Sequence, residues 1–196
     1  MAARKSTRPG GSPAGRGGSI FYAFAPWIVF DVVASPSTWG YAALAGLITA
    51  VVLSGPSIAR GQIKLLDLVA IIFFAGISLV ALVVGRKDLL WLETYAQVLS
   101  SAVIAVAAFV SLAFDPFTAQ YARDSAPREV WGTPEFRRVN RMLTLLWATV
   151  FAVIALLGLL ALHVRSGSDW LNWILPIALI VVAVKITSRQ GGLRRT

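Results

Sequence analysis

Six apolar blocks separated by short polar connections are the feature that most constrains this chain. About 20 residues, each rising 1.5 Å, carry a helix across roughly 30 Å of hydrocarbon, and several blocks are slightly shorter than that. A soluble core would interleave polar faces along its helices. The sequence therefore predicts an all-α, polytopic transmembrane bundle of about six short helices. The blocks cover residues 20–34, 38–54, 62–84, 89–114, 140–162 and 170–186.

Composition agrees with a membrane solvent. Of the 196 residues 57% are apolar and 14% are charged, and the mean hydropathy is +0.74. Soluble domains are nearer a quarter charged. The length permits one transmembrane domain, which we expect over residues 20–187. The chain has no cysteine, which excludes disulfides, thiolate metal sites and cysteine nucleophiles.

The two ends of the chain are polar and basic. Residues 1–19 hold four Lys or Arg and no acid among many Gly, Ser and Pro, which predicts a disordered cytoplasmic tail. Residues 188–196 form a second basic cytoplasmic tail. The first apolar block resembles the core of a signal peptide, but Asp31 interrupts it and no small-x-small cleavage site follows. We interpret it as an uncleaved first helix, and five spans are the alternative.

The distribution of Lys and Arg predicts the orientation. With six spans and both termini in the cytoplasm, fifteen of the eighteen basic residues lie inside, and only Arg86, Lys87 and Arg165 lie outside. Retained cations orient membrane proteins in this way. A multi-pass protein of the plasma (bacterial inner) membrane is therefore expected. Anionic headgroups also account for the net charge of +9 without nucleic acid as a partner.

The longest polar connection, residues 115–139, is expected to be a cytoplasmic amphipathic loop or helix. Asp115 before Pro116, and Thr133 before Pro134, have the form of helix N-caps. The functional interpretation is an interfacial helix that binds anionic lipid or a partner through aromatics and arginines. The alternative is a helical connection whose aromatics seal the base of the bundle, and this alternative is favoured. The candidate lipid or partner contacts are Arg123, Arg128, Arg137, Arg138 and Arg141.

Charged side chains inside spans are functional candidates because their desolvation is unfavourable. One hypothesis joins several of them at the outer ends of the helices into a cluster that binds a cation or relays a proton. Glu93 and Gln97 share a helical face and suit the wall of an aqueous cavity. Interfacial salt bridging is the alternative, and it is preferred because transport sites usually lie near the midplane. The cluster comprises Asp31, Arg86, Lys87, Glu93 and Gln97.

Other polar and small residues are interpreted structurally. Asp67 and Lys64 have the spacing of a local pair, and Ser100 and Ser101 are expected to pack helices together. Ala42, Gly46 and Gly76 are expected to allow close helix approach. Trp27 and Trp147 fall inside the spans, whereas the interfacial tryptophans are Trp39, Trp91, Trp170 and Trp173.

No motif for catalysis or for a cofactor is visible. The chain lacks GxSxG, Walker A, GxGxxG and HExxH patterns. The single histidine, His163, cannot form a metal site without further ligands. We therefore expect no catalytic, cofactor-binding or metal-binding residues, and the protein is predicted not to be an enzyme.

The charged GRKDL connection at residues 85–89 and the DPFTAQYAR segment at residues 115–123 carry a resemblance. With a basic tail and a short first span containing an acid, this layout resembles the small bacterial inner-membrane proteins called intracellular septation protein A. It is also similar to actinobacterial membrane proteins that carry a PFTxQYAR segment. The resemblance implies a cell-envelope protein that assists division or wall synthesis through membrane partners, with no cofactor and no catalytic residue. The longer segment at residues 125–136 departs from the shorter loops of that family.

These observations favour a non-enzymatic envelope scaffold, associated with division, that contacts anionic headgroups and acts through membrane-protein partners or copies of itself. The alternative is a small transporter or channel for an ion or small solute that uses the outer acidic residues. Neutralising Asp31 and Glu93 would abolish transport but leave the binding of a scaffold nearly intact.

Overall fold

The computed structural model describes residues 19–35, 38–83, 86–164 and 169–192, with side chains omitted for residues 19, 86–93 and 191–192. Within these ranges the chain forms helices and no strand, as the sequence predicts. The long helices are α1 (Ser19–Val33), α2 (Trp39–Ala59), α3 (Leu65–Val83), α4 (Arg86–Ser111), α6 (Pro134–Ala161) and α7 (Leu175–Gly192). The shorter elements are α5 (Phe117–Ala122), a 3-10 turn (Arg128–Val130) and a π-helical turn (Trp170–Ile174).

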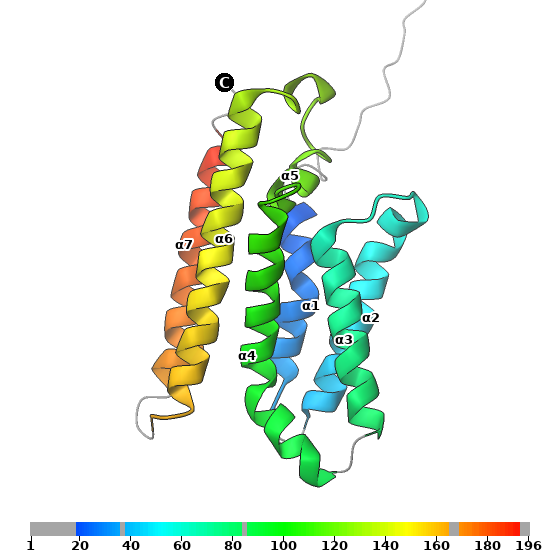
Figure 1. Ribbon diagram of the computed structural model, residues 1–196, viewed down its shortest axis with the longest axis vertical. Coiled ribbons are helices and arrows are strands. Elements are labelled where there is room, and N and C mark those ends of the chain that lie inside the picture. Colours follow the sequence, from blue (N-terminus) through cyan, green and yellow to red (C-terminus); the bar gives the residue numbers. More distant parts are fainter. Residues whose placement is uncertain (1–18, 36–37, 84–85, 165–168, 193–196) are drawn as a thin grey trace, which may run out of the picture.

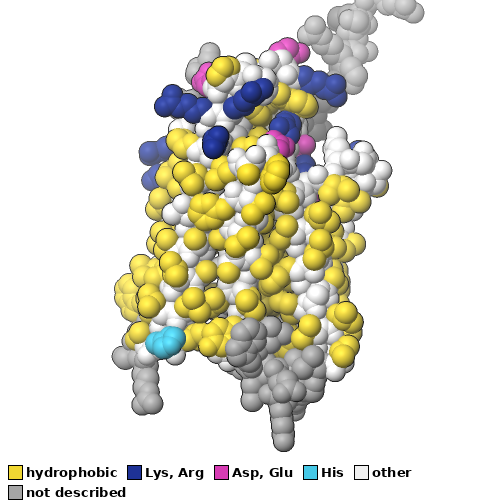
Figure 2. Space-filling model, in the orientation of Figure 1, with side chains coloured by type: hydrophobic (Ala, Val, Ile, Leu, Met, Phe, Trp, Pro, Cys, Tyr) yellow, Lys and Arg dark blue, Asp and Glu magenta, His cyan; other side chains and the backbone are white. Residues whose placement is uncertain are grey.

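The six long helices run along one axis of the bundle (Figure 1). α4 stands between the α6–α7 pair on one side and α1, α2 and α3 on the other. The start of α1 and the end of α7 lie at the same end of the bundle as α5. Lys and Arg side chains gather at this end, and hydrophobic side chains cover the flanks (Figure 2). We call it the basic end.

Among the described residues, five helices are long and apolar enough to cross a membrane, namely α2, α3, α4, α6 and the segment from Trp170 to Gln190. The chain is therefore a multi-pass membrane protein with an all-α bundle. The first apolar helix is shorter, with 15 residues in α1, and spans about 22 Å at 1.5 Å per residue. The sequence-based alternative of five spans differs only in how this helix is counted.

Several helices extend beyond the apolar blocks that predict them. α2 continues through Pro56 to Ala59 and ends with Gly61 at a φ of 72°, a left-handed conformation that suits glycine. The Gly61 amide donates to the Ile58 carbonyl and the Gln62 amide to the Ser57 carbonyl, which together form a Schellman cap. Hydropathy alone does not register these polar last turns.

α6 begins six residues before its apolar block. The Thr133 hydroxyl accepts a hydrogen bond of 3.2 Å from the Phe136 amide, and Pro134 occupies the first turn. This confirms the N-cap predicted at Thr133. The polar first turns of α6 thus project beyond the apolar flank and carry arginines.

Aromatic rings of α1 form the centre of the core. Phe24 lies 4.8 Å from the Trp147 ring of α6, measured between centroids, and Trp27 lies 4.9 Å from the Phe74 ring of α3. Phe30, one turn further, also contacts Phe74 at 5.4 Å. The shortest long helix therefore joins the two halves of the bundle.

The tryptophan side chains test where the sequence predicts buried and interfacial rings. Trp27 and Trp147 are buried as expected, and Trp170 and Trp173 are exposed. Trp39 is the first residue of α2, at the helix end where the sequence places it, and its side chain is buried against neighbouring helices. The Trp91 side chain lies outside the described residues.

Close helix approach is confirmed at Gly46 and wrong at Gly76. A Cβ at Gly46 would lie 3.0 Å from the Phe74 ring, whereas a Cβ at Gly76 would meet nothing within 4 Å. Ala42, one turn before Gly46, is fully buried, as its predicted packing role requires.

Candidate functional site

The connection between α4 and α6 folds onto the basic end of the bundle. Phe117 and Tyr121 of α5 are buried, and the Phe117 ring meets Phe24 edge-on at 6.3 Å. The Thr118 hydroxyl donates to the Asn140 carbonyl at 2.7 Å and lies 2.8 Å from the Thr144 hydroxyl. The aromatics of α5 therefore seal the base of the bundle, which is the interpretation that the sequence favoured over contact with lipid.

A polar network ties α5 to the start of α3. The Tyr121 hydroxyl donates to Asp67 Oδ1 at 2.8 Å, and the Leu65 amide donates to Gln120 Oε1 at 2.8 Å. The Lys64 ammonium forms an ion pair with Asp124 and lies 4.6 Å from the centre of the Tyr121 ring. Burial, together with the negative charge of Asp67, raises the pKa of Tyr121 above its ordinary value. The phenol therefore remains a hydrogen-bond donor at neutral pH.

The sequence predicted a local pair of Lys64 with Asp67. The structure keeps the charge of Lys64 acting on Asp67 and adds a partner to each residue: Lys64 binds the carboxylate of Asp124, 60 residues away along the chain, and Asp67 accepts a hydrogen bond from the phenol of Tyr121. Spacing along one helix cannot reveal partners supplied by a distant connection.

Arg123 closes the connection from the other side. Its guanidinium donates two hydrogen bonds to the Asp115 carboxylate, each of 2.7 Å. Hydrogen bonding to Asp115 raises the pKa of Arg123. The predicted N-cap at Asp115 is wrong because this carboxylate is bound to Arg123. The Ser111 hydroxyl accepts from the Phe117 amide instead, at 3.1 Å.

The remaining arginines of the candidate set are exposed. Arg137, Arg138 and Arg141 lie on the first two turns of α6, and within the described chain none of them forms an ion pair or hydrogen bond. Arg128 is exposed and lies 5.8 Å from the centre of the Trp131 ring. Trp131 is itself fixed, since its indole N–H donates to the Ala126 carbonyl at 3.0 Å. The five candidate arginines thus divide into one paired residue, Arg123, and four available ones.

Two hollows flank the Lys64–Asp124 ion pair. A cavity of about 280 Å³ lies between α1, α2, α3 and α5 and is lined by residues that include Tyr22, Ser57 and Asp67. A larger, open groove of about 950 Å³ lies between the start of α3 and the connection, with Arg60, Arg128 and Trp131 on its walls. Both hollows are at the basic end, where a polar ligand could enter from the aqueous side.

The predicted outer cluster is described only in part. The Ser100 hydroxyl donates to Asp31 Oδ1 at 3.3 Å, and the side-chain amide of Gln97 donates to the backbone carbonyl of Asp31 at 3.2 Å. The structure thus brings Asp31 and Gln97 together. The side chains of Arg86, Lys87 and Glu93 lie outside the described residues.

Asp31 lies two residues before the end of α1, at the part of the helix where the sequence places it, and the hydrogen bond from Ser100 attaches it to α4. Ser100 was predicted only to pack helices, and its role as a partner of Asp31 was missed.

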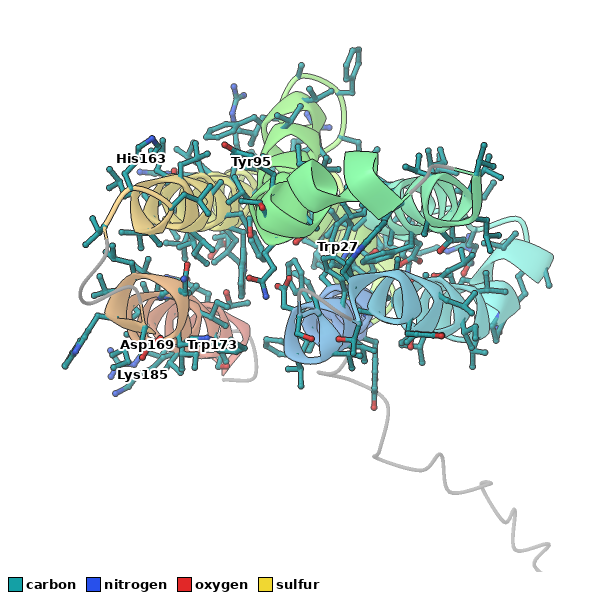
Figure 3. The ribbon with its side chains drawn as sticks, turned by 90° about the horizontal axis from the view of Figure 1, so that it is seen from below. Trp27, Tyr95, His163, Asp169, Trp173 and Lys185 are labelled. Atoms are coloured by element: carbon teal, nitrogen blue, oxygen red, sulfur yellow. The ribbon has the colours of Figure 1, made fainter. Side chains whose placement is uncertain are left out.

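No metal site is apparent in the described part of the chain, where no group of three or more His, Asp or Glu residues is placed to hold an ion. His163 lies at the end of the bundle opposite the basic end (Figure 2), and its Nδ1 atom lies 3.0 Å from the Leu159 carbonyl oxygen. Figure 3 shows Asp169 apart from His163, beside α7.

Thr118, Thr144 and Asn140 form the polar contact that sequence reasoning missed. A cluster of polar residues at the end of an apolar block is the signal that could have indicated it.

Comparison with models of protein families, with curated protein sequences and with solved structures finds no match for this chain.

Proposed function

We propose that this protein is a non-enzymatic scaffold of the plasma membrane, with both termini in the cytoplasm, whose basic end contacts anionic headgroups and membrane-protein partners. The cell-envelope and division setting comes from the resemblance of residues 85–89 and 115–123 to septation proteins. The bundle, the position of its cations and the fixed connection support the scaffold role.

One observation carries the proposal. Arg137, Arg138 and Arg141 are exposed and have no ion-pair partner in the described part of the chain, and the apolar side chains of Met142 and Leu145 are exposed on the next turn of α6. Cations directly above an apolar flank can reach lipid phosphates while their aliphatic stems stay on hydrocarbon. We call these three arginines the α6 collar.

The connection that precedes the collar is rigidly held. Its hydrogen bonds to α3 and α6, together with the Arg123–Asp115 pair, fix the start of α6 relative to the bundle. A fixed array of cations suits docking better than a flexible one because less conformational entropy is lost on binding.

The orientation is tested with single cysteines, since the natural chain has none. Ser125→Cys places an exposed thiol at the basic end, and His163→Cys places one at the opposite end. In intact spheroplasts a membrane-impermeant maleimide should label His163→Cys and leave Ser125→Cys unlabelled until the membrane is permeabilised. The reverse pattern would refute the cytoplasmic placement of the basic end.

Lipid contact is tested in reconstituted vesicles with spin-labelled phosphatidylglycerol and phosphatidylcholine. The protein should immobilise the anionic lipid preferentially, and Arg137→Gln, Arg138→Gln and Arg141→Gln together should remove most of that preference. Lys substitutions at the same three positions keep the positive charge and should keep the preference for phosphatidylglycerol. Equal immobilisation of both lipids by the unmodified protein would rule out headgroup contact by the collar.

A small transporter is the second candidate, favoured by the contact of Asp31 with Ser100. A carboxyl group on an apolar helix, hydrogen-bonded to a neighbouring helix, is a usual element of ion or proton pathways. Asp31→Asn with Glu93→Gln should abolish solute flux in vesicles if transport occurs. The same pair of substitutions should leave the lipid preference of a scaffold unchanged.

A further inference from the structure

The open groove between the start of α3 and the connection has an excess of positive charge. Its two acids are both engaged by cations, since Asp115 binds Arg123 and Asp124 binds Lys64. Arg60 and Arg128 remain on the groove walls without a carboxylate partner in the described chain. Arg60 makes a long hydrogen bond of 3.5 Å to the Ser57 hydroxyl, and Arg128 faces the Trp131 ring. Two guanidinium groups thus surround a space with a net charge of about +2.

The floor of the groove leads onto an apolar strip. Leu68 lines the groove and is 42% exposed, and Ile72, one turn further along α3, is 63% exposed. Gly76 has open space beside it, and Leu79 is again exposed on the same side of the helix. The strip from Leu68 to Leu79 rises over eleven residue steps, about 16 Å, which matches one leaflet of a hydrocarbon core roughly 30 Å thick.

Charge and apolar surface therefore occur in the order that a phospholipid presents them. A phosphate between Arg60 and Arg128 would satisfy the two guanidinium groups, which bind phosphate oxygens in forked geometry. An acyl chain would then lie on the strip of α3. A free phosphate would leave the strip unused, and a water-soluble peptide would meet it only inside the membrane.

We propose that this groove binds one anionic phospholipid, its phosphate held by Arg60 and Arg128 and one acyl chain packed along Leu68, Ile72 and Leu79. Trp131 forms the wall on the headgroup side, where its hydrogen bond to the Ala126 carbonyl fixes the indole ring. The site rests on the proposed function, because the basic end must face headgroups for the lipid to reach it. It differs from the α6 collar in being a single open groove with walls from two parts of the chain rather than an array on one helix surface.

Native mass spectrometry of the detergent-solubilised full chain tests the site with dioleoyl phosphatidylglycerol as the probe and dioleoyl phosphatidylcholine as its neutral counterpart. One phosphatidylglycerol should bind more tightly than any later one. Arg60→Gln with Arg128→Gln should weaken that first binding by on the order of tenfold or more, given the usual contribution of each cation near headgroups. Leu68→Asn, which acts on the acyl chain, should weaken it independently.

The collar provides the matched control. Arg137→Gln, Arg138→Gln and Arg141→Gln remove more charge but lie outside the groove, so the first phosphatidylglycerol should remain bound. If the collar and groove variants weaken binding equally, or if phosphatidylcholine binds as tightly, the groove is not a specific site. If the collar variant loses its preference for the spin-labelled anionic lipid but still binds the first phosphatidylglycerol, that result supports both proposals. An unchanged first lipid in the Arg60/Arg128 variant would refute the groove and leave the collar standing.

Discussion

The first and last helices of the bundle differ in where their aromatic side chains lie. α1 places Phe24, Trp27 and Phe30 in the core, whereas Trp173, in the π-helical turn that leads into α7, is exposed. Seen from the end opposite the basic end, Trp27 lies in the middle of the bundle and Trp173 beside α7 at its edge (Figure 3). α7 packs against α6 and exposes most of its surface. Both segments are apolar, so hydropathy predicts a span and does not predict how deeply a helix lies among its neighbours.

Replacing Trp27 by Ala should have the largest effect on stability. Truncation removes contacts with Phe73 and Phe74, and the free energy of unfolding should fall by about 3 kcal/mol. This loss is at the low end of those known for replacing a large buried side chain by Ala, because the hydrophobic effect contributes little to helix association within lipid. Unfolding in mixed detergent and dodecyl sulfate micelles, followed by circular dichroism, measures the loss.

Trp173→Ala is the matched control for that measurement. Its ring is 47% exposed compared with 2% for Trp27, so the change should be within about 0.5 kcal/mol, as for other exposed positions. Trp27→Phe should retain most of the stability, because the Trp27 indole N–H has no hydrogen-bond partner to lose among the described residues. Equal losses for the two Ala variants would mean that α1 is not the core helix.

Gly46→Leu should have the next largest effect. The new side chain would press on Phe74, which contacts Trp27 and Phe30, and overpacking of this kind destabilises by about 2 kcal/mol. Gly76→Leu adds the same atoms where the space is open and should be nearly neutral. If Gly46→Leu left the free energy of unfolding unchanged, the packing around α1 would be loose.

Tyr121→Phe tests the polar attachment at the basic end. Loss of the hydrogen bond to Asp67 should lower the free energy of unfolding by about 1.5 kcal/mol, since the acceptor is charged. The raised folded-state pKa means that the unfolded chain releases this proton first, above the ordinary value of 10.0. Stability should therefore fall as pH rises past that value, and the Phe variant should fall less steeply. Parallel pH dependences would exclude Tyr121 as the titrating group.

Thr187→Val should give the smallest effect. The Trp147 indole N–H donates to the Thr187 hydroxyl at 3.1 Å and joins α6 to α7. Its loss should lower stability by about 1 kcal/mol and speed hydrogen exchange in α7 more than in α1. Ser188→Ala, whose hydroxyl bonds only within α7, serves as the control. Faster exchange in both helices alike would indicate that α7 is not a separately attached edge.

Much of the fold follows from local properties of the sequence. Apolar blocks locate the long helices, and the Thr133–Pro134 pair locates the start of α6. The depth of α1 depends on which neighbours its rings meet, and spacing within one helix does not encode that. Hydropathy also cannot predict that α2 continues through Pro56, because a cap little more than one turn later stabilises its polar end.

The candidate sites were less accessible to sequence reasoning. Exposed arginines on α6 could be identified from charge alone, and Asp31 with Gln97 was correctly placed in one cluster. The partners of Lys64, Asp67 and Asp115 depend on how residues 115–139 fold back onto α3 and α4. Such contacts join residues that are far apart in the chain, so no local sequence pattern predicts them.

The Arg123–Asp115 and Lys64–Asp124 pairs also determine how far the electric field of this protein extends. A formal charge of +9 suggests a uniformly attractive surface for anions, but paired cations cancel at short range and contribute little beyond a few ångströms. Because the net charge already counts Asp115 and Asp124, the field at the membrane surface comes from the other cations, among them the exposed arginines of α6. Ionic strength should consequently weaken long-range attraction to a membrane while leaving the fold of the connection nearly unaffected.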